Sequence, residues 1–349
     1  MIATDLPRRR PHFGGVSRAT VGMPAAATVP IDPFSHFAKS MGGRLVVNLD
    51  AATVAVAGSA AATRASAVAV ERIERWAARL TRHTDASDLA RLNADPGDDV
   101  PVRPTLATAL RAGGQAFEES EGLTDITLLD ARLAAEGGVY AGPAGDPRLP
   151  GQAEYSSRAF DWSIAPGRHG SAVVRRPPGV RFDLGGVGKG WIADRALRLF
   201  AAWPSVVIDA DGDLAIRCAP GRMWELAVDD PRSPDAALAV LRLTAPDGFP
   251  MTWGVATSGT SIHRWTVEGN VSHHLIDPRS GRPAVSDVIQ ATVIAGSALR
   301  AESLAKAAVI AGSAHGFALL ERAGVRGAIL LTERGEALAL PRTLPLLAS

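Results

Sequence analysis

The sequence predicts an α+β fold in which one β-sheet carries flanking helices. Strand-like segments come in groups, helices are inserted at both ends of these groups, and the strict alternation of a doubly wound sheet is absent. With 349 residues, of which 46% are hydrophobic, the chain can bury a substantial core. We expect one compact unit over residues 36–349. Residues 1–35, rich in Pro, Gly, Ala and Arg without periodicity, are expected to form a disordered arm.

The early part of this unit shows a change of hydrophobic period. Residues 43–50 and 53–58 are predicted to form two strands joined by a tight turn. Apolar residues at intervals of three and four then predict a helix over residues 60–83. Ser87 can cap a short helix that ends near Asn93, because its hydroxyl can accept from the first free amides.

The middle and the end of the chain continue this mixture of helix and strand. A helix is predicted over residues 106–121, where Gly122 ends it, and Thr124 is expected to cap a second helix that opens at once. The Gly- and Pro-rich residues 137–157 predict a long surface loop. The remaining predicted strands are 160–164, 172–174, 180–184, 206–208, 214–217, 225–228, 239–243, 252–256, 288–294, 328–331 and 337–340, and the remaining helices are 191–201, 302–311 and 314–323.

Composition excludes several classes of function. Lys plus Arg number 37 against 36 Asp plus Glu, so bulk charge does not favour nucleic acid. The single cysteine, Cys218, excludes an internal disulfide and a multi-thiolate metal site. No run of about 18 apolar residues occurs, and no apolar core of a secretory signal follows the basic N-terminal cluster. We therefore expect no membrane span and a cytoplasmic location.

A glycine-rich segment over residues 183–190 is the first candidate site. It matches neither a P-loop nor a dinucleotide fingerprint, so an NAD-type oxidoreductase is disfavoured. Small residues at a helix N-terminus expose backbone groups that suit an anion or a cation-bridged anion. The alternative is a plain helix-entry turn with Lys189 in solvent. Likewise, Glu302 and Lys306 form either a surface ion pair or a pair of charges that point into this site.

The second candidate site lies between residues 257 and 306, where titratable groups gather inside apolar flanks. A Thr-Ser-Gly turn is expected at residues 257–259. His273 and His274 are candidates for a general base, for metal ligands or for ordinary polar strand residues. The turn that begins at Asp277 follows them directly and would fix where His274 points.

Taken in order, these motifs resemble the ApbE family, the FAD:protein FMN transferases. The matching segments are residues 40–42, 80–83, 87–93, 124–127, 183–190, 209–213, 257–259, 274–281 and 301–307. The resemblance covers roughly residues 37–340. It implies the ApbE-like, T-fold-like architecture, a single compact unit of mixed sheet with flanking helices.

The resemblance also implies an activity. FAD would be cleaved at its pyrophosphate, FMN would pass to a Thr or Ser hydroxyl of an acceptor flavoprotein, and AMP would leave. Catalytic roles would fall to His274, as base, and to Asp277. The residues implied to hold FAD are Met41, His83, Thr124, Asp125, Ile126, Asp183, Lys189 and Leu275. The carbonyl of Gly186 and the carboxylate of Glu302 would hold the Mg²⁺ that such chemistry usually employs.

Five departures from the family pattern stand out, one of them Thr260 in place of the acid that follows Thr-Ser-Gly. The most consequential is Lys306, which occupies the position of a metal-binding Thr and has no lone pair when protonated. Glu302 replaces Asp, His83 replaces Tyr, and Thr124 replaces Phe. We expect catalysis that is weak, altered in metal demand or absent, while FAD binding survives. An FAD-binding protein without catalysis and an FAD pyrophosphatase therefore remain the alternatives.

Overall fold

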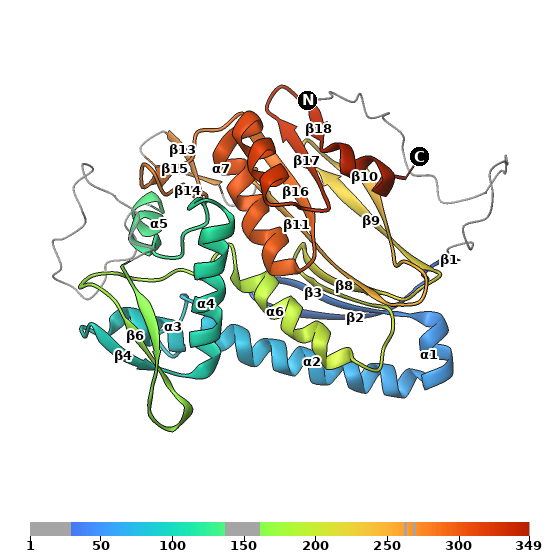
Figure 1. The fold of residues 1–349 in the computed structure, drawn as a ribbon, viewed down its shortest axis with the longest axis horizontal. Coiled ribbons are helices and arrows are strands. Elements are labelled where there is room, and N and C mark those ends of the chain that lie inside the picture. The colour runs from blue at the N-terminus through green and yellow to red at the C-terminus, as the bar shows by residue number, and fades with distance from the viewer. Residues whose placement is uncertain (1–28, 137–160, 262–263, 268–269, 349) are drawn as a thin grey trace.

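The computed structural model describes residues 29–136, 161–261, 264–267 and 270–348 (Figure 1). The expected loop at 137–157 and residues 1–28 of the expected arm lie outside these ranges. Residues 29–35 correct the boundary of the arm, because they belong to β1 (Val29–Pro30) and to the start of β2 (Pro33–Ser40). β1 pairs with a later strand, and β2 pairs along its whole length with its neighbour in the sheet.

The centre of the molecule is an eight-stranded sheet in the order β18-β17-β16-β11-β8-β7-β3-β2. Every neighbouring pair in it is antiparallel, so the sheet expected to be mixed is antiparallel, while the α+β class is confirmed. Besides β2, its strands are β3 (Gly43–Asp50), β7 (Val206–Ala210), β8 (Asp213–Cys218), β11 (Met251–Gly259), β16 (Val288–Ala295), β17 (Gly327–Thr332) and β18 (Ala337–Ala339).

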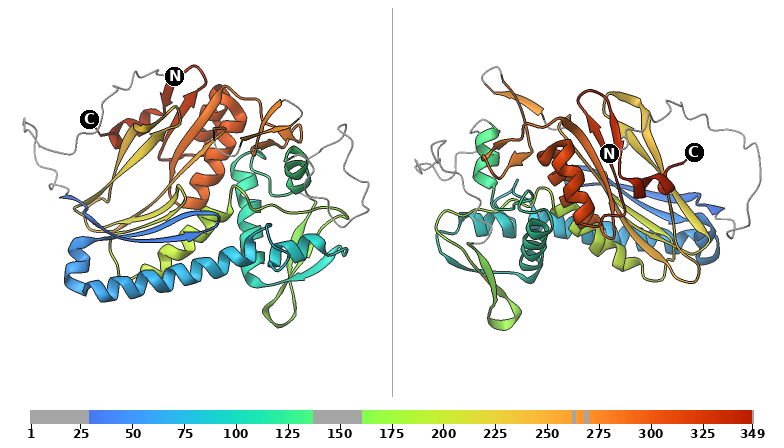
Figure 2. Two further views of the ribbon diagram at one scale, coloured as in Figure 1. Left: turned by 180° about the vertical axis from the view of Figure 1, so that it is seen from behind. Right: turned by 45° about the horizontal axis from the view of Figure 1, so that its top comes forward.

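Different elements cover the two faces of this sheet (Figures 1 and 2). On one face α6 (Gly188–Leu197) packs on β7 and β8, and α7 (Ala298–Arg322) packs on β11 and β16. On the other face lies a small sheet of β1, β9 (Arg222–Asp230) and β10 (Ser233–Thr244). Because side chains alternate along a strand, Val206 and Ile208 enter the core under the helices, and Val207 enters the core under β9 and β10.

A helical layer, a short three-stranded sheet (β4-β6-β5) and two short hairpins (β12-β13 and β14-β15) complete the described part of the fold. The helices are α1 (Ala51–Ala57), α2 (Ser59–Leu80), α3 (Asp88–Ala94), α4 (Pro104–Glu119) and α5 (Leu129–Ala135). The short strands are β4 (Asp99–Val102), β5 (Ser163–Pro166), β6 (Ala172–Arg175), β12 (Arg264–Val267), β13 (Asn270–His273), β14 (Ile276–Asp277) and β15 (Arg282–Pro283). Three short 3-10 helices are Arg168–Gly170, Arg198–Phe200 and Pro341–Leu346.

Length and apolar composition would allow α7 to cross a membrane, and the same holds for the bent pair α1–α2 taken as one span. However, 61% of the most apolar 18-residue stretch of α7 is buried within the protein. The helix packs over the central sheet, which is typical of a core helix.

Several local predictions are confirmed. The helix expected over 60–83 is α2, and the helix expected over 106–121 is α4. The Ser87 hydroxyl accepts from the Ala90 amide at 2.8 Å, as expected of the α3 cap. Here the local signal and the tertiary environment favour the same structure.

Other local predictions are wrong. Residues 53–57 lie in α1, where the Asp50 carboxylate caps the first turn, and Gly58 ends this helix. Residues 180–184 form no strand, and the helix expected at Thr124 does not form. Instead, the Thr124 hydroxyl donates to the carbonyl of Ser303, 179 residues away. The turn expected at 257–259 is the end of β11. In contrast, Gly312 (φ 79°) is non-helical and interrupts α7, so the two helices expected over 302–311 and 314–323 are confirmed.

Candidate active site

The glycine-rich segment forms a tight loop before α6. The Asp183 amide donates to the Ile126 carbonyl at 2.8 Å, and the Asp183 carboxylate accepts from the Gly185 amide at 3.0 Å. Gly186 has φ +105°, a conformation that residues with a Cβ rarely adopt. The amide of Gly188 then donates to the Leu184 carbonyl as α6 begins. The loop therefore brings backbone groups together at the N-terminus of a helix, where partial positive charge favours anions.

Helices α6 and α7 hold each other through reciprocal contacts at their N-terminal ends. The Glu302 carboxyl group of α7 accepts from the Gly190 amide of α6 at 2.8 Å. In return, the Asp194 carboxylate of α6 accepts from the amides of Ala298 and Leu299 at 2.8 and 3.0 Å. A Cβ on Gly190 would lie 2.6 Å from backbone atoms of these two residues, so only glycine permits this approach. The contacts place Glu302 directly beneath the glycine-rich loop.

Lys189 is held by buried acids and does not simply extend into solvent. Its ammonium lies 2.8 Å from the Asp213 carboxylate and donates to the Asp211 carbonyl at 3.2 Å. Burial opposes the charge on Lys189, but the carboxyl groups of Asp213 and Glu302 outweigh it and raise its pKa. Burial, followed by the charge of Asp213, raises the pKa of Glu302 to about 8. The site thus favours the charged form of Lys189 and disfavours the charged form of Glu302.

Lys306 reaches the same loop from α7. Its ammonium donates to the Gly185 carbonyl at 3.1 Å, so the surface ion pair with Glu302 is not its arrangement in the fold. Burial lowers its pKa, and the nearby carboxylates of Asp183 and Asp125 oppose that shift. Neither lysine therefore extends freely into solvent, although 36% of the Lys189 side chain is exposed.

An ion-pair chain leads from the loop to His83. The Arg82 guanidinium lies 2.6 Å from the Glu136 carboxylate and 3.9 Å from that of Asp183. The pKa of His83 is lowered by burial and by the charge of Arg82, while Asp183 and Glu136 oppose this shift. The structure thus brings His83 and Asp183, both implied to hold FAD, into one electrostatic environment.

The segment around His274 is fixed by its neighbours. Arg132 of α5 donates to the His274 carbonyl at 3.0 Å. The His273 ring is buried; its Nδ1 accepts from the Leu275 amide at 3.2 Å and its Nε2 donates to the Ala284 carbonyl at 3.0 Å. This pattern requires a neutral ring at His273, which is therefore structural. The side chain of Leu275 is buried in the core, so Leu275 positions His274 and does not offer a side chain to a ligand.

Asp277 shapes the turn that follows. Its carboxylate accepts from the backbone and the guanidinium of Arg279, at 2.9 and 2.8 Å. Its carbonyl accepts from the amides of Ser280 and Gly281. The structure therefore engages Asp277 within its own turn and not with the glycine-rich loop.

Met41 lies in the turn between β2 and β3, with φ +56°. The neighbouring Gly43 packs against Asp211 in the turn between β7 and β8, and the Asp211 carbonyl is the one that Lys189 contacts. Two turns thus place Met41 at the same end of the sheet as the glycine-rich loop.

Residues 124–126 lie next to the glycine-rich loop, because the Ile126 carbonyl accepts a hydrogen bond from the Asp183 amide. The hydroxyl of Thr124 is used by α7, as described above, and the Ile126 side chain is buried against Gly113. The Asp125 carboxylate accepts from the amide and the hydroxyl of Thr127, both at 2.7 Å, and its charge acts on Lys306. Only Asp125 of these three therefore contributes its side chain to the charges of the site.

The residues implied to hold Mg²⁺ do not fit a divalent ion. The Lys306 ammonium lies against the carbonyl of Gly185, and its stem crosses Gly186 so closely that a Cβ there would lie 2.7 Å from Lys306 Cδ. One oxygen of Glu302 already accepts from a helix amide. Within the described part of the chain, no group of three or more His, Cys, Asp or Glu side chains is placed to hold a metal ion.

Sequence reasoning missed the partners that hold these side chains. Asp213 appeared only as the last residue of a matched motif, yet it is buried and anchors Lys189. Arg132 and Glu136 lie 2.6 Å apart and connect α5 to the site. The signal that could have identified Asp213 is its position: an acidic residue directly after the Asp211-Gly212 turn, at the start of β8. No local signal marks the other two.

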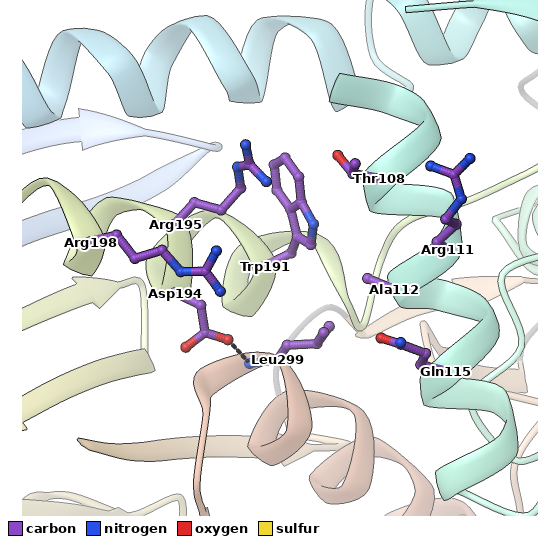
Figure 3. Close-up of a pocket in the computed structure, with 9 residues that line it drawn as sticks. All are labelled: Thr108, Arg111, Ala112, Gln115, Trp191, Asp194, Arg195, Arg198 and Leu299. Atoms are coloured by element: carbon purple, nitrogen blue, oxygen red, sulfur yellow. Dashed lines mark hydrogen bonds between the residues drawn. The ribbon is translucent and has the colours of Figure 1, made fainter. Parts of the chain in front are cut away.

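A separate cavity of about 300 Å³ lies between α4, α6 and the start of α7 (Figure 3). Arg111, Arg195 and Arg198 line it, and the Arg195 guanidinium stacks 4.6 Å from the centre of the Trp191 ring. None of the residues proposed above for FAD or metal lines this cavity. It is therefore distinct from the glycine-rich site.

Comparison with known proteins decides the family. The model of the ApbE family matches residues 41–330. The chain belongs to the ApbE family. The curated FAD:protein FMN transferase of Salmonella typhimurium is 28% identical over 160 residues, which are 45% of this chain and 44% of that protein. The Escherichia coli K12 protein of the same description is 27% identical over 172 residues, 48% of this chain and 47% of that protein. These alignments span about half the length of the ApbE relatives.

Solved ApbE structures share the fold over nearly the whole chain. The apo form of the Pseudomonas stutzeri flavinyl transferase ApbE has a TM-score of 0.73 at 22% identity and covers 91% of this chain and 98% of that one. The ApbE protein of Thermotoga maritima has a TM-score of 0.70 at 22% identity and covers 91% of this chain and 100% of that one. The ApbE architecture expected from the motifs is thus confirmed.

Proposed function

We propose that this chain is an FAD:protein FMN transferase. It would move FMN from FAD to a Thr or Ser hydroxyl of an acceptor flavoprotein and release AMP. The observation that carries the proposal is the glycine-rich loop at the N-terminus of α6, where the Lys306 ammonium contacts the Gly185 carbonyl and where α6 supplies Lys189, held by Asp213. Such a site suits a pyrophosphate, because helix amides and ammonium groups both stabilise phosphate charge. Membership of the ApbE family and the named relatives support FAD as the source of that pyrophosphate.

In the proposed reaction the acceptor hydroxyl oxygen attacks the phosphorus of the FMN half of FAD. A new phosphoester bond forms, the bond from that phosphorus to the bridging oxygen breaks, and AMP carries that oxygen away. Lys189 stays charged through Asp213 and would stabilise negative charge on the phosphates. The hydroxyl proton would pass to His274, whose backbone Arg132 holds from α5. Asp277 and Arg279 would position His274 by fixing the following turn.

The test is the intact mass of a flavin-acceptor domain after incubation with this protein and FAD. A gain of one FMN that appears with FAD and not with free FMN is the expected result, because only FAD carries the pyrophosphate bond. The His274→Ala variant should lose the gain. His315→Ala, an exposed histidine on α7, is the matched control and should keep it.

Two other outcomes overturn the transferase. Bound FAD without a mass gain in any acceptor domain tested would leave an FAD-binding protein without catalysis. Free FMN and AMP without a change in acceptor mass would leave an FAD pyrophosphatase.

A further inference from the structure

The side chain of Lys306 lies against the glycine-rich loop next to Gly186, the residue whose carbonyl the family resemblance assigns to a metal ion. It donates to the Gly185 carbonyl at 3.1 Å, although the two residues are 121 positions apart. Gly186, at φ +105°, passes under the lysine stem, and a Cβ there would lie 2.7 Å from Lys306 Cδ and 3.1 Å from Nζ. The loop is therefore shaped around this side chain.

Charges from several elements face the ammonium. Burial has the largest effect and lowers the pKa of Lys306, and the charge of Arg132 on α5 acts in the same direction. The carboxylates of Asp183 in the loop, Asp125 after α4 and Glu302 one turn earlier on α7 oppose that shift. The side-chain nitrogen therefore lies among carboxyl groups of the kind that a bound cation would require.

The composition of the chain adds a second argument. Of its 37 basic residues only three are lysines: Lys39, Lys189 and Lys306. One of the three, Lys189, belongs to the glycine-rich segment, and a second, Lys306, contacts it, while the other 34 basic residues are arginines. An ammonium is a compact point charge on a flexible stem, which suits a position otherwise taken by a small cation better than a planar guanidinium does.

We propose that Lys306 is the resident cation of this site and takes the place of a divalent metal ion toward the pyrophosphate of FAD. This rests on the proposed function, because it names how the FAD of that reaction is bound. FAD binding then needs no divalent ion, and FMN transfer proceeds without one. A single charge attracts a phosphate oxygen about half as strongly as a divalent ion at the same distance, so transfer is slow.

Two variants distinguish the proposed role of the Lys306 ammonium from that of a metal ion. Lys306→Thr places a hydroxyl four residues after Glu302 and removes the charge, so it opens the position to a cation. Lys306→Met removes the charge and retains a long stem without an oxygen ligand. Lys39→Thr, at an exposed position on β2, is the matched control. Circular dichroism verifies that each variant is folded.

The first measurement is Mn²⁺ binding without nucleotide, followed by the electron paramagnetic resonance of free Mn²⁺. Wild type, Lys306→Met and Lys39→Thr should leave the free-ion signal unchanged, while Lys306→Thr should reduce it in a way that Mg²⁺ reverses. Stoichiometric Mn²⁺ binding by the wild type would overturn the proposal, whether or not the protein transfers FMN.

The second measurement is FAD affinity with EDTA and with Mg²⁺. Wild type should bind equally in both. Lys306→Met should bind about 10- to 100-fold more weakly in both, the range expected for one charge-assisted hydrogen bond. Lys306→Thr should match that loss in EDTA and recover with Mg²⁺, together with faster FMN transfer. Wild-type binding that collapses in EDTA, or full binding by Lys306→Met, would contradict the proposal.

The two proposals fail separately. If FAD binds without EDTA sensitivity and no acceptor gains mass, the transferase fails and the resident cation stands. If FMN transfer occurs but requires Mg²⁺, the transferase stands and the resident cation fails. If no FAD binds at all, the proposed function fails, and the proposed role of Lys306 toward FAD fails with it.

Discussion

The substitution Gly190→Ala tests the contact on which the site depends. Gly190 lets α6 approach the first residues of α7, and an added Cβ would lie 2.6 Å from the Ala298 carbonyl carbon and the Leu299 amide nitrogen. These are backbone atoms that cannot rotate away, so the two helices must separate. Separation also stretches the hydrogen bond from the Gly190 amide to Glu302.

The size of the effect follows from three terms. Forcing an extra carbon into a packed contact costs about 1–3 kcal/mol. The hydrogen bond from the Gly190 amide to Glu302 is worth about 1 kcal/mol. Alanine offsets about 1 kcal/mol of this, because it favours a helix over glycine. We therefore expect the free energy of unfolding of Gly190→Ala to fall by about 1–3 kcal/mol.

Urea denaturation at pH 7, followed by circular dichroism, measures this change. Gly188→Ala is the matched control, since the same atom added two residues earlier meets only the Leu184 Cβ, at 3.6 Å. The control should leave stability unchanged or raise it by up to about 1 kcal/mol. Equal stability of the two variants would refute the argument that backbone contact at Gly190 sets the spacing of the helices.

Three further predictions concern stability and reactivity. Asp194→Ala should lower the free energy of unfolding by about 2 kcal/mol, because two amides of α7 lose their acceptor; a loss below about 0.5 kcal/mol in urea denaturation would contradict this. In a double-mutant cycle of Asp213→Asn and Lys189→Met, the coupling should be about 1–2 kcal/mol. This coupling free energy is smaller than for a fully buried pair, because 36% of the Lys189 side chain is exposed. If the effects of the two substitutions on stability simply add, the proposed pairing is refuted. Burial raises the pKa of Cys218 to about 11, so a thiol reagent at pH 8 should modify it only after unfolding, and fast modification of the native protein would contradict its burial.

The features predicted correctly from the sequence are those that depend on residues close together in the chain. The helical period of α2, the Ser87 cap of α3 and the strands of the central sheet follow from side chains within a few residues of one another. The glycine-rich segment and the order of the motifs were likewise sufficient to recognise the ApbE family. Where prediction failed, a distant partner competed with the local preference. Thr124 was expected to cap a helix of its own and instead bonds α7, because the fold offers its hydroxyl a buried carbonyl.

Lys306 is a residue whose environment could not be predicted from the sequence. From the sequence it follows that a lysine stands four residues after Glu302 and that a glycine-rich segment precedes a helix. Their spacing favoured a pair of charges on a helix surface. The packing of α7 on the central sheet is a property of the fold, and it places both side chains next to the glycine-rich loop. The reason is physical: burial of the apolar surface of α7 sets its orientation, and the charged groups on that face must then find partners in the loop.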